Sequence, residues 1–296
     1  MPKNSAPTAS KGRSWGLERR LQFIDFRLRW EGNINRTDLT TFFGLSIPQA
    51  SLDISKYTEI APNNLFYDRS AKTYVATPSY RPVYPQSSAL RYLEELLAMR
   101  SGVLEPDASF IGSAPEVDWS HTPSIAIDEQ TVTTLVKAIR KKLAVWVSYQ
   151  SLLHYEATLS LISPHALAHD GFRWYVRAFC NTQQQFCNFA LNRILRIDGI
   201  EPSVEEPATD KHWQTHVTLI LAPHPSLSPV QKRILELDYG MKEGEASLRC
   251  RQAFLRHTLK RLGLQTKEQD ELNNSQLILK NRPALQPYID ALPESI

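Results

Sequence analysis

The spacing of apolar residues changes along this chain, and each change requires a different kind of fold. Up to Leu143 the apolar residues of each helical segment recur every three or four positions, which is the period of one helix face. From Ala144 to Ile200 the period is two, which is typical of strands with one buried side. From Trp213 onwards strand-like and helix-like segments alternate. The pattern predicts a multidomain α/β protein with a helical N-terminal region, a small central β-barrel and a small C-terminal α/β domain.

The N-terminal region has the element order helix, short helix, tight turn, helix, hairpin. Asn35 is placed to cap the second helix, Gly44 and Leu45 form the turn, and Ser46 opens a capping box at the third helix. This order is that of a winged helix-turn-helix, so we predict that the region binds double-stranded operator DNA. The predicted elements are helices over residues 15–31, 36–43 and 46–59 and a hairpin over residues 65–76 with its tip at residues 68–70.

The third predicted helix has two different faces. An apolar stripe that starts at Ile47 faces the core, and the opposite face carries hydrogen-bonding side chains suited to base edges and phosphates in the major groove. Basic side chains at the hairpin suit phosphates. Ser46 and Gln49 have the alternative role of capping the helix, and Lys56 that of a solvated surface lysine. The candidate DNA-binding residues are Arg36, Ser46, Gln49, Ser51, Ser55, Lys56, Arg69 and Lys72.

Charge is distributed unevenly along the chain. Residues 1–85 contain 12 Lys and Arg against 7 Asp and Glu, a net charge of +5. The rest contains 22 against 24, a net charge of −2, so the overall +3 arises from the first third. A basic N-terminal region on a near-neutral body favours contact with a polyanion.

The remaining segments are predicted from the same patterns. Residues 77–88 contain three prolines and have the composition of a linker, residues 101–124 resemble a loop, and the acidic segment 201–211 separates the barrel from the C-terminal region. The predicted helices cover residues 90–99, 128–143, 229–238 and 252–262, and the predicted strands cover residues 145–150, 155–163, 172–180, 186–191, 194–197, 217–221, 246–251 and 276–280.

The central region contains a recognisable motif. Residues 171–179 (GFRWYVRAF) resemble the signature of the WYL domain, with Val176 where that family has leucine. Residues 147–149 (VSY), 162–165 (ISPH) and 189–194 (FALNRI) resemble its neighbouring segments. With a winged helix before this motif and an α/β extension after it, the chain resembles the bacterial WYL regulators, in particular the BrxR- and CapW-type repressors that control phage-defence operons.

The resemblance implies a function and a site. The WYL domain of this family is an Sm/SH3-like barrel whose polar and basic cleft takes a charged ligand. The resemblance therefore implies a sequence-specific repressor controlled by a small anionic ligand or a nucleic-acid fragment. It also implies that the C-terminal domain helps to form a homodimer. The cleft residues carried over to this chain are Tyr149, Ser151, His165, Tyr175, Arg177 and Arg193.

Strand alternation separates the side chains of the motif. It places Tyr175 and Arg177 on one face of their strand and Trp174 and Val176 on the other. We therefore expect Trp174 in the core and Arg177 in the cleft, where a guanidinium group suits forked contacts with phosphate or carboxylate.

Alternatives remain for three of these residues. Arg177 and Arg193 would have a structural role if they paired with acids, although residues 144–200 contain only three acids, Glu156, Asp170 and Asp198. His165 would have one if it only completed a turn beside Pro164.

The chain lacks the motifs of common enzymes. It contains no P-loop, nucleophile elbow, HExxH motif or paired carboxylates in a useful context, so we expect no catalysis, cofactor or metal. Residues 163–165 near Asp170 are the nearest approach to a catalytic cluster, but nothing in the sequence orients them. Cys180, Cys187 and Cys250 are too few and too irregular for a disulfide framework or a zinc site, which predicts free thiols.

We expect a cytoplasmic protein, because no apolar run is long enough to span a bilayer and the N-terminus has no signal-peptide core. The competing hypothesis is a nucleic-acid-sensing adaptor whose barrel binds single strands and whose winged helix contacts protein. The predicted boundaries are a disordered tail (1–14), a winged helix (15–80), a linker with connecting helices (81–143), the barrel (144–200) and a C-terminal dimerisation domain (213–296).

Overall fold

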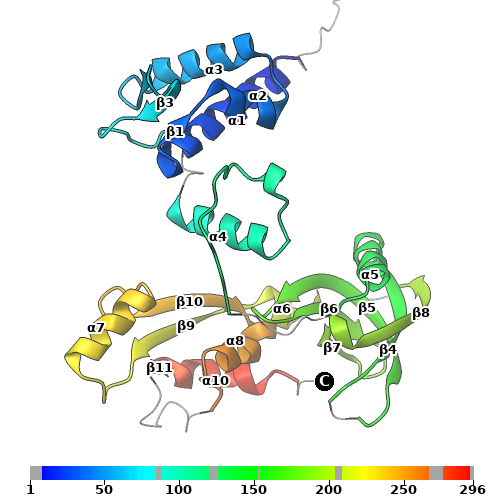
Figure 1. Cartoon of the computed structure of the whole chain (residues 1–296). Helices are drawn as coiled ribbons and strands as arrows, with labels where there is room; N and C mark the ends of the chain where they lie inside the picture. Colours follow the sequence, from blue (N-terminus) through cyan, green and yellow to red (C-terminus); the bar gives the residue numbers. More distant parts are fainter. Residues whose placement is uncertain are drawn as a thin grey trace, which may run out of the picture. The chain divides into compact units, whose positions relative to one another are not determined.

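The chain forms two compact units, residues 1–121 and 122–296 (Figure 1). The computed structural model describes residues 9–84, 88–120, 126–152, 154–203, 209–266 and 276–293, with side chains from Trp15 onwards. No helix among these residues is both long and apolar enough to cross a membrane. The first helix begins at Ala9 and so overlaps the predicted disordered tail, of which residues 1–8 lie outside the described residues.

The first unit contains the predicted winged helix. A three-stranded antiparallel sheet of order β1-β3-β2 lies beside three helices, and Leu39, Ile54 and Tyr57 are among the residues fully buried between them. The side chain of Asn35 accepts the backbone N–H of Asp38 and caps α2, as predicted. The elements are α1 (Ala9–Trp30), β1 (Asn33–Ile34), α2 (Arg36–Phe43), α3 (Ile47–Ile60), β2 (Leu65–Asp68), β3 (Thr73–Ala76) and α4 (Ala89–Arg100).

Asp25 on α1 is fully buried and joins distant parts of this unit. Its carboxylate accepts hydrogen bonds from the hydroxyls of Tyr57 (2.6 Å) and Tyr80 (3.0 Å). It also accepts the backbone N–H groups of Val83 and Tyr84 (3.1 Å each). Burial, reinforced by the bond to Asp25, raises the pKa of Tyr57 and keeps its hydroxyl a donor. The beginning of the predicted linker is therefore anchored to α1.

The loop predicted over residues 101–124 also contributes to the core of the first unit. The ring of Phe110 packs edge-on against Phe23 and Phe42, with centroids 5.2 and 5.5 Å apart. Ile111 is buried beside Leu96 of α4. This segment belongs to the region predicted as a linker with connecting helices (81–143). Its packing was not foreseen, because single buried side chains in a segment without periodicity leave no pattern to detect.

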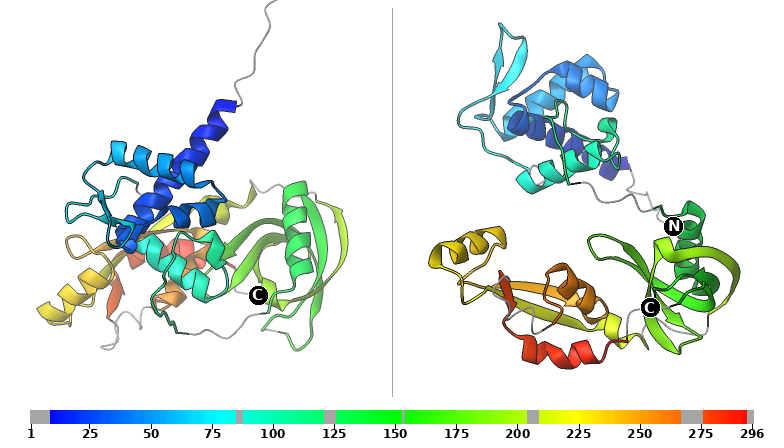
Figure 2. Two further views of the ribbon diagram at one scale, coloured as in Figure 1. Left: turned by 45° about the horizontal axis from the view of Figure 1, so that its top comes forward. Right: turned by 60° about the horizontal axis from the view of Figure 1, so that its bottom comes forward.

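The second unit begins with α5, which covers one face of a five-stranded antiparallel sheet (Figure 2). The strand order is β7-β6-β5-β4-β8, and the edge strands β7 and β8 do not pair with each other, so the predicted barrel is partly open. The side chain of Asp128 caps α5. The elements are α5 (Glu129–Lys141), β4 (Leu143–Tyr149), β5 (Thr158–His169), β6 (Trp174–Cys180), β7 (Gln185–Ala190) and β8 (Ile194–Pro202).

One alternative and one expectation for this sheet are wrong. β5 continues through the turn proposed at Pro164 and His165, and His165 occupies a bulge where the register against β6 shifts. The side chain of Trp174 is 47% exposed rather than in the core, whereas Val176 on the same face is fully buried. Trp174 is the first residue of β6 and lies against His169 at the end of β5, where the core no longer covers the sheet.

The C-terminal domain is a three-stranded antiparallel sheet of order β10-β9-β11 with helices packed on it. α7 extends from the end of this domain that lies farther from the five-stranded sheet (Figures 1 and 2). The helix α10 was not predicted. The elements are α6 (Lys211–Gln214), β9 (His216–Pro223), α7 (Pro229–Asp238), β10 (Ala246–Arg251), α8 (Leu255–Arg261), β11 (Leu277–Leu279) and α10 (Arg282–Asp290).

Candidate nucleic-acid interface and ligand cavity

One side of α3 is buried in the first unit and the other is exposed. Ala50, Ile54 and Tyr57 are buried on the core side. Ile47, which we expected to be part of this apolar stripe, is 64% exposed because it is the first helical residue and lies beyond the core. The exposed residues of α3 are Ile47, Pro48, Leu52, Ser55, Lys56, Glu59 and Ile60.

Two of the predicted DNA-binding residues at the start of α3 make contacts within the protein. The Ser46 hydroxyl accepts the backbone N–H of Gln49 and caps the helix. The Gln49 side-chain amide donates to Oδ1 of Asp53 (3.0 Å), a buried carboxylate that is ion-paired with Arg20 (2.7 Å). The capping alternative therefore holds for Ser46 but not for the Gln49 side chain, which bonds to Asp53 and does not complete a capping box.

Arg36 and Ser51, also predicted to contact DNA, contact each other. Nε of Arg36 donates to the Ser51 hydroxyl, and Nη2 donates to the hydroxyl of Tyr74 on β3, both at 2.8 Å. The Arg36 guanidinium lies over the Tyr67 and Tyr74 rings, with its carbon 5.7 and 5.3 Å from their centroids. These contacts hold α2, α3 and the hairpin in one arrangement. Six of the eight candidate residues lie on or beside α3: Arg36, Ser46, Gln49, Ser51, Ser55 and Lys56.

The tip of the hairpin is built by Asp68 and presents two cations. The Asp68 carboxylate accepts the hydroxyl of Ser70 and the backbone N–H groups of Ser70 and Ala71, and these bonds lower its pKa. Arg69 and Lys72 are both exposed at this turn, as predicted, and neither forms an ion pair within the described residues.

In the second unit, Arg177 is fully buried and paired with a carboxylate. Nε and Nη2 of Arg177 donate to the two oxygens of Asp210, at 2.8 and 3.0 Å. Nε2 of His165 lies 3.0 Å from the same carboxylate, and Nη1 of Arg177 lies 3.3 Å from the side-chain oxygen of Asn188. Burial opposes ionisation of Asp210, but the bonds from His165 and Arg177 outweigh it and lower its pKa. Arg177 therefore has the alternative role considered for it, that of pairing with an acid.

Asp210 also fixes the start of the C-terminal domain. Its carboxylate accepts the backbone N–H of Trp213 and caps α6. The Trp213 ring contacts His165 edge-on at 5.6 Å and lies under the guanidinium of Arg251 at 4.4 Å. Sequence reasoning missed Asp210 because it counted acids only within residues 144–200, and Asp210 follows that range in the predicted linker.

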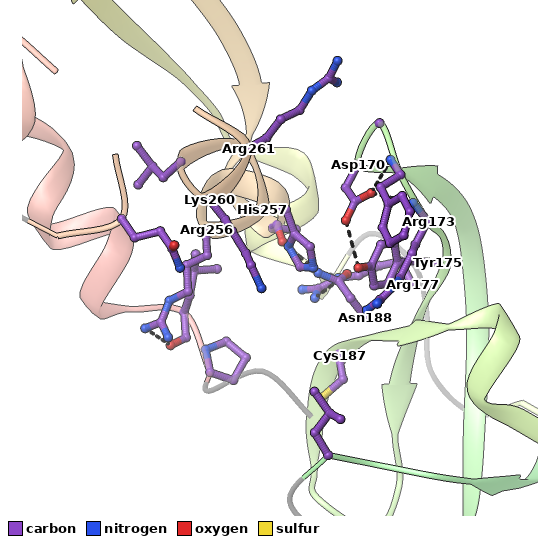
Figure 3. A pocket seen from close by; sticks show the side chains of 18 of the residues that line it. Asp170, Arg173, Tyr175, Arg177, Cys187, Asn188, Arg256, His257, Lys260 and Arg261 are labelled. Atoms are coloured by element: carbon purple, nitrogen blue, oxygen red, sulfur yellow. Dashed lines mark hydrogen bonds between the residues drawn. The ribbon is translucent and has the colours of Figure 1, made fainter. Parts of the chain in front are cut away.

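A cavity of about 850 Å³ lies beside this pair, between the five-stranded sheet and α8 (Figure 3). Of the predicted ligand residues, Tyr149, Tyr175, Arg177 and Arg193 line it, whereas Ser151 and His165 do not. The other charged or titratable residues of its described lining are Asp170, Arg173, Cys187, Arg256, His257, Lys260 and Arg261.

The cations on α8 were not predicted as site residues. Arg256, Lys260 and Arg261 follow one another at spacings of four and one, so the helix has a basic side that a charge-pattern search would find. Only the fold brings this side against the sheet. The close approach is evident at Gly171, where a methyl group would lie 2.2 Å from Nη1 of Arg261 and where φ is +95°.

Three polar side chains at the cavity have perturbed acidity. Burial raises the pKa of Tyr175 to about 12, helped by the bond that its hydroxyl donates to Asp170 (2.9 Å). Burial works against the charge of Asp170, but the backbone N–H groups of Arg173 and Phe172 and the Tyr175 hydroxyl lower its pKa overall. Burial lowers the pKa of His257, which favours the neutral ring.

The cysteines and metal-binding groups add no further site. All three cysteines are free, and burial raises the pKa of Cys187 to about 12, which disfavours a reactive thiolate. The described residues contain no group of side chains arranged to hold a metal ion.

Known protein families match successive parts of the chain. The BrxR transcriptional regulator winged helix-turn-helix domain matches residues 16–98, and the WYL domain matches residues 130–198. The BrxR transcriptional regulator C-terminal dimerization domain matches residues 216–285. These matches define a winged-helix transcriptional regulator of the WYL class.

Relatives narrow the assignment. The chain is 44% identical over 253 residues, 85% of each chain, to the DNA-binding transcriptional repressor CapW of Stenotrophomonas maltophilia. It is 41% identical over 292 residues, 97% of each chain, to CapW of Pseudomonas aeruginosa. The chain thus belongs to the BrxR/CapW family of WYL-domain transcriptional repressors. Among solved structures, the proteasome accessory factor PafBC of Arthrobacter aurescens aligns with 92% of this chain and 50% of that chain, at 15% identity and a TM-score of 0.23.

The buried ion pair predicts a large effect on stability. Arg177→Ala leaves the Asp210 carboxylate buried without its main partner, and we expect a loss of about 3–5 kcal/mol in the free energy of unfolding. Arg177→Met combined with Asp210→Leu removes both charges and is expected to recover much of that loss. Urea unfolding of the three proteins measures the difference, and an Arg177→Ala protein as stable as the wild type would contradict a structural role.

The same pair predicts a dependence on pH. The pKa of Asp210 is lowered on folding, so its contribution to stability is present above the unfolded-state pKa of about 3.9 and is lost as the pH falls below it. The double variant lacks this contribution, and its unfolding midpoint is expected to fall less steeply than that of the wild type in acid.

Proposed function

We propose that this chain is a sequence-specific DNA-binding repressor of a phage-defence operon and that a ligand bound in the second unit controls it. The observation that carries the DNA-binding part is the exposed side of α3, held by the Arg36–Ser51–Tyr74 contacts beside a hairpin with two free cations. The relatives named CapW are described as DNA-binding transcriptional repressors, which supports the same function here.

In this proposal α3 enters the major groove and the hairpin lies over the neighbouring backbone. Ser55 and Lys56 are exposed at the middle of α3 and are placed for base edges and nearby phosphates. Gln49 and Ser51 reach the groove from the first turns while they keep their internal partners. Arg69 and Lys72 contact phosphates and supply affinity without specificity.

Ser55→Ala with Lys56→Ala tests the reading role of α3. Both side chains are exposed, so the fold should persist, and the preference for operator over random duplex should fall by about 1–3 kcal/mol for each base contact that the variant removes. Electrophoretic shifts with the promoter of the chain's own gene measure this ratio. Glu59→Ala is the matched control, because it breaks the Lys56–Glu59 ion pair (2.7 Å) without removing a candidate DNA-binding residue.

Two outcomes would count against the proposal. If Glu59→Ala and the double variant lose specificity equally, the effect comes from the helix and not from base contacts. If the wild type prefers single strands to every duplex, the competing adaptor hypothesis is favoured.

Arg69→Ala tests the role of the hairpin. It is expected to weaken binding to all duplexes alike and to reduce the salt dependence of the binding constant by about one unit of slope.

The cavity supports control by a ligand. Arg193 lines the cavity, is half-buried and pairs with no carboxylate of the described residues. Ligands that bind a repressor more tightly in one state than in another change its operator affinity, typically by about 5- to 150-fold. Phage challenge is the signal we propose, because the BrxR- and CapW-type repressors that this chain resembles control phage-defence operons.

The Arg193→Ala protein is expected to fold and to bind operator in vitro, because in this proposal Arg193 contacts only the ligand. In cells, a reporter gene under the repressed promoter is expected to stay repressed after phage challenge. Arg196→Ala is the matched control: it removes an arginine three residues away that is 71% exposed, pairs with Asp198 and does not line the cavity. Normal induction of the reporter by Arg193→Ala would eliminate this residue as part of the sensor.

We also propose a homodimer formed through α7. Val230, Ile234 and Leu237 form one apolar face of this helix and are 70%, 51% and 76% exposed. An apolar helix face that is exposed in one chain is a common partner surface, and α7 lies inside the region that matches the dimerization domain. A two-fold dimer would present two copies of α3 to paired half-sites.

Ile234→Asp with Leu237→Asp places charges on this face and is expected to convert the dimer to monomers in sedimentation equilibrium, with weaker operator binding as a result. Leu195→Asp is the control, since Leu195 is 61% exposed on β8 and far from α7 in sequence. Wild-type protein that sediments as a monomer, or a double variant that remains dimeric, would contradict this interface.

A further inference from the structure

The walls of the cavity come from two domains. On one side, the loop between β5 and β6 contributes Arg173, and on the other side α8 contributes Lys260 and Arg261 (Figure 3). The turn before β8 adds Arg193 to the side of the sheet. Gly171 in the loop between β5 and β6 lies against the guanidinium of Arg261 on α8, which a side chain at residue 171 would displace. A molecule in this cavity therefore contacts the sheet and the C-terminal domain together.

The charge of the lining is strongly unbalanced. Five cations, Arg173, Arg193, Arg256, Lys260 and Arg261, line the cavity and have no carboxylate partner among the described residues. Asp170 is the one carboxylate of the described lining, which leaves an excess of about four positive charges. The Nε groups of Arg173 and Arg256 also lack a hydrogen-bond partner within the described structure. Such a cavity favours a ligand with several negative charges.

Arg177 is not available as the main anion contact. Two of its three nitrogens donate to Asp210 and the third donates to Asn188, so a ligand would have to break a buried ion pair to reach it. The free cations lie instead on the loop before β6, in the turn before β8 and on α8. Arg177, the arginine of the sequence motif, thus holds the two domains together beside the cavity. The cations around it are the groups available to bind an anionic ligand.

The size and the remaining lining restrict the ligand further. Pockets of about 300–1,000 Å³ take molecules from drug size to nucleotide size, and this cavity is about 850 Å³. Arginine and lysine side chains bind phosphate oxygens strongly, and arginine does so with two parallel donors. Leu152, Phe172 and Ile289 add an apolar part to the lining, and Phe172 is 42% exposed.

We propose that the cavity binds a small ligand carrying at least two phosphate groups, held between Arg173 and Arg193 of the sheet and Lys260 and Arg261 of α8. The proposal rests on the ligand control proposed above and names the ligand class and the helix that completes the site. Because α8 and α7 belong to the same domain, a ligand that bridges the walls acts on the domain that carries the proposed dimer interface.

Isothermal titration of the full chain with sodium tripolyphosphate and with ADP tests the proposal. The wild type is expected to bind at least one probe, and Lys260→Ala with Arg261→Ala is expected to weaken binding at least about tenfold. Both residues are exposed, so the fold should persist. Lys137→Ala with Arg140→Ala on α5 is the matched control, since these cations are equally exposed, lie outside the cavity lining and are expected to change affinity by less than about twofold.

The two probes separate the possible sources of the phosphate groups. Tighter binding of ADP indicates a nucleotide whose base uses the apolar lining, and tighter binding of tripolyphosphate indicates that the phosphate chain suffices; both support the proposal. Lys260→Arg with Arg261→Lys keeps the charges and should retain binding. Two results would overturn the proposal: no binding of either probe by the wild type, or equal losses in the α8 and α5 variants.

Operator titration of the same proteins without probe distinguishes this proposal from the proposed function. If the α8 variant binds operator normally but no longer binds the probe, both proposals stand. If the wild type binds operator and its reporter is induced by phage, but it binds neither probe, the repressor function stands and the proposal of a phosphate ligand fails. If no operator is bound at all, the proposed function fails, whatever the probes do.

Discussion

The buried pair of Arg177 and Asp210 is the interaction on which the second unit depends. It joins the strand that carries the WYL motif to the first helix of the C-terminal domain, because Asp210 also caps α6. A charge buried without its partner is far more costly than a surface ion pair that is broken, so the two groups must be buried together. His165 completes the arrangement from the bulge in β5, which turns its side chain toward the carboxylate.

This pair also determines where the cavity can bind an anion. The positive charge of Arg177 is neutralised, so the excess charge comes from the loop before β6, from Arg193 and from α8. The cavity consequently belongs to two domains and not to the five-stranded sheet alone. A ligand that bridges both walls is well placed to influence the C-terminal domain, since the contacts that it makes lie on each side of the junction.

The first unit uses buried polar groups in a similar way. Asp25 connects α1 to the segment after the hairpin, and Asp53 holds Arg20 and Gln49 beside the start of α3. Arg36 connects α2, α3 and β3. Because these groups are satisfied inside the unit, α3 has a defined orientation within it before any DNA is bound, so the helix itself does not have to be ordered on binding.

The sequence by itself determined the order of the domains, the winged helix, the period-two sheet and most strands and helices, because these depend on local periodicity and capping. It identified Tyr149, Tyr175, Arg177 and Arg193 as residues of the cavity through the family motif and its neighbouring segments. Only the tertiary structure decided that Arg177 pairs with Asp210, that Trp174 is exposed at a strand end, that Phe110 belongs to a core and that α8 forms a wall of the cavity. Each of these depends on residues distant in sequence or on what covers a surface, and no local pattern records either.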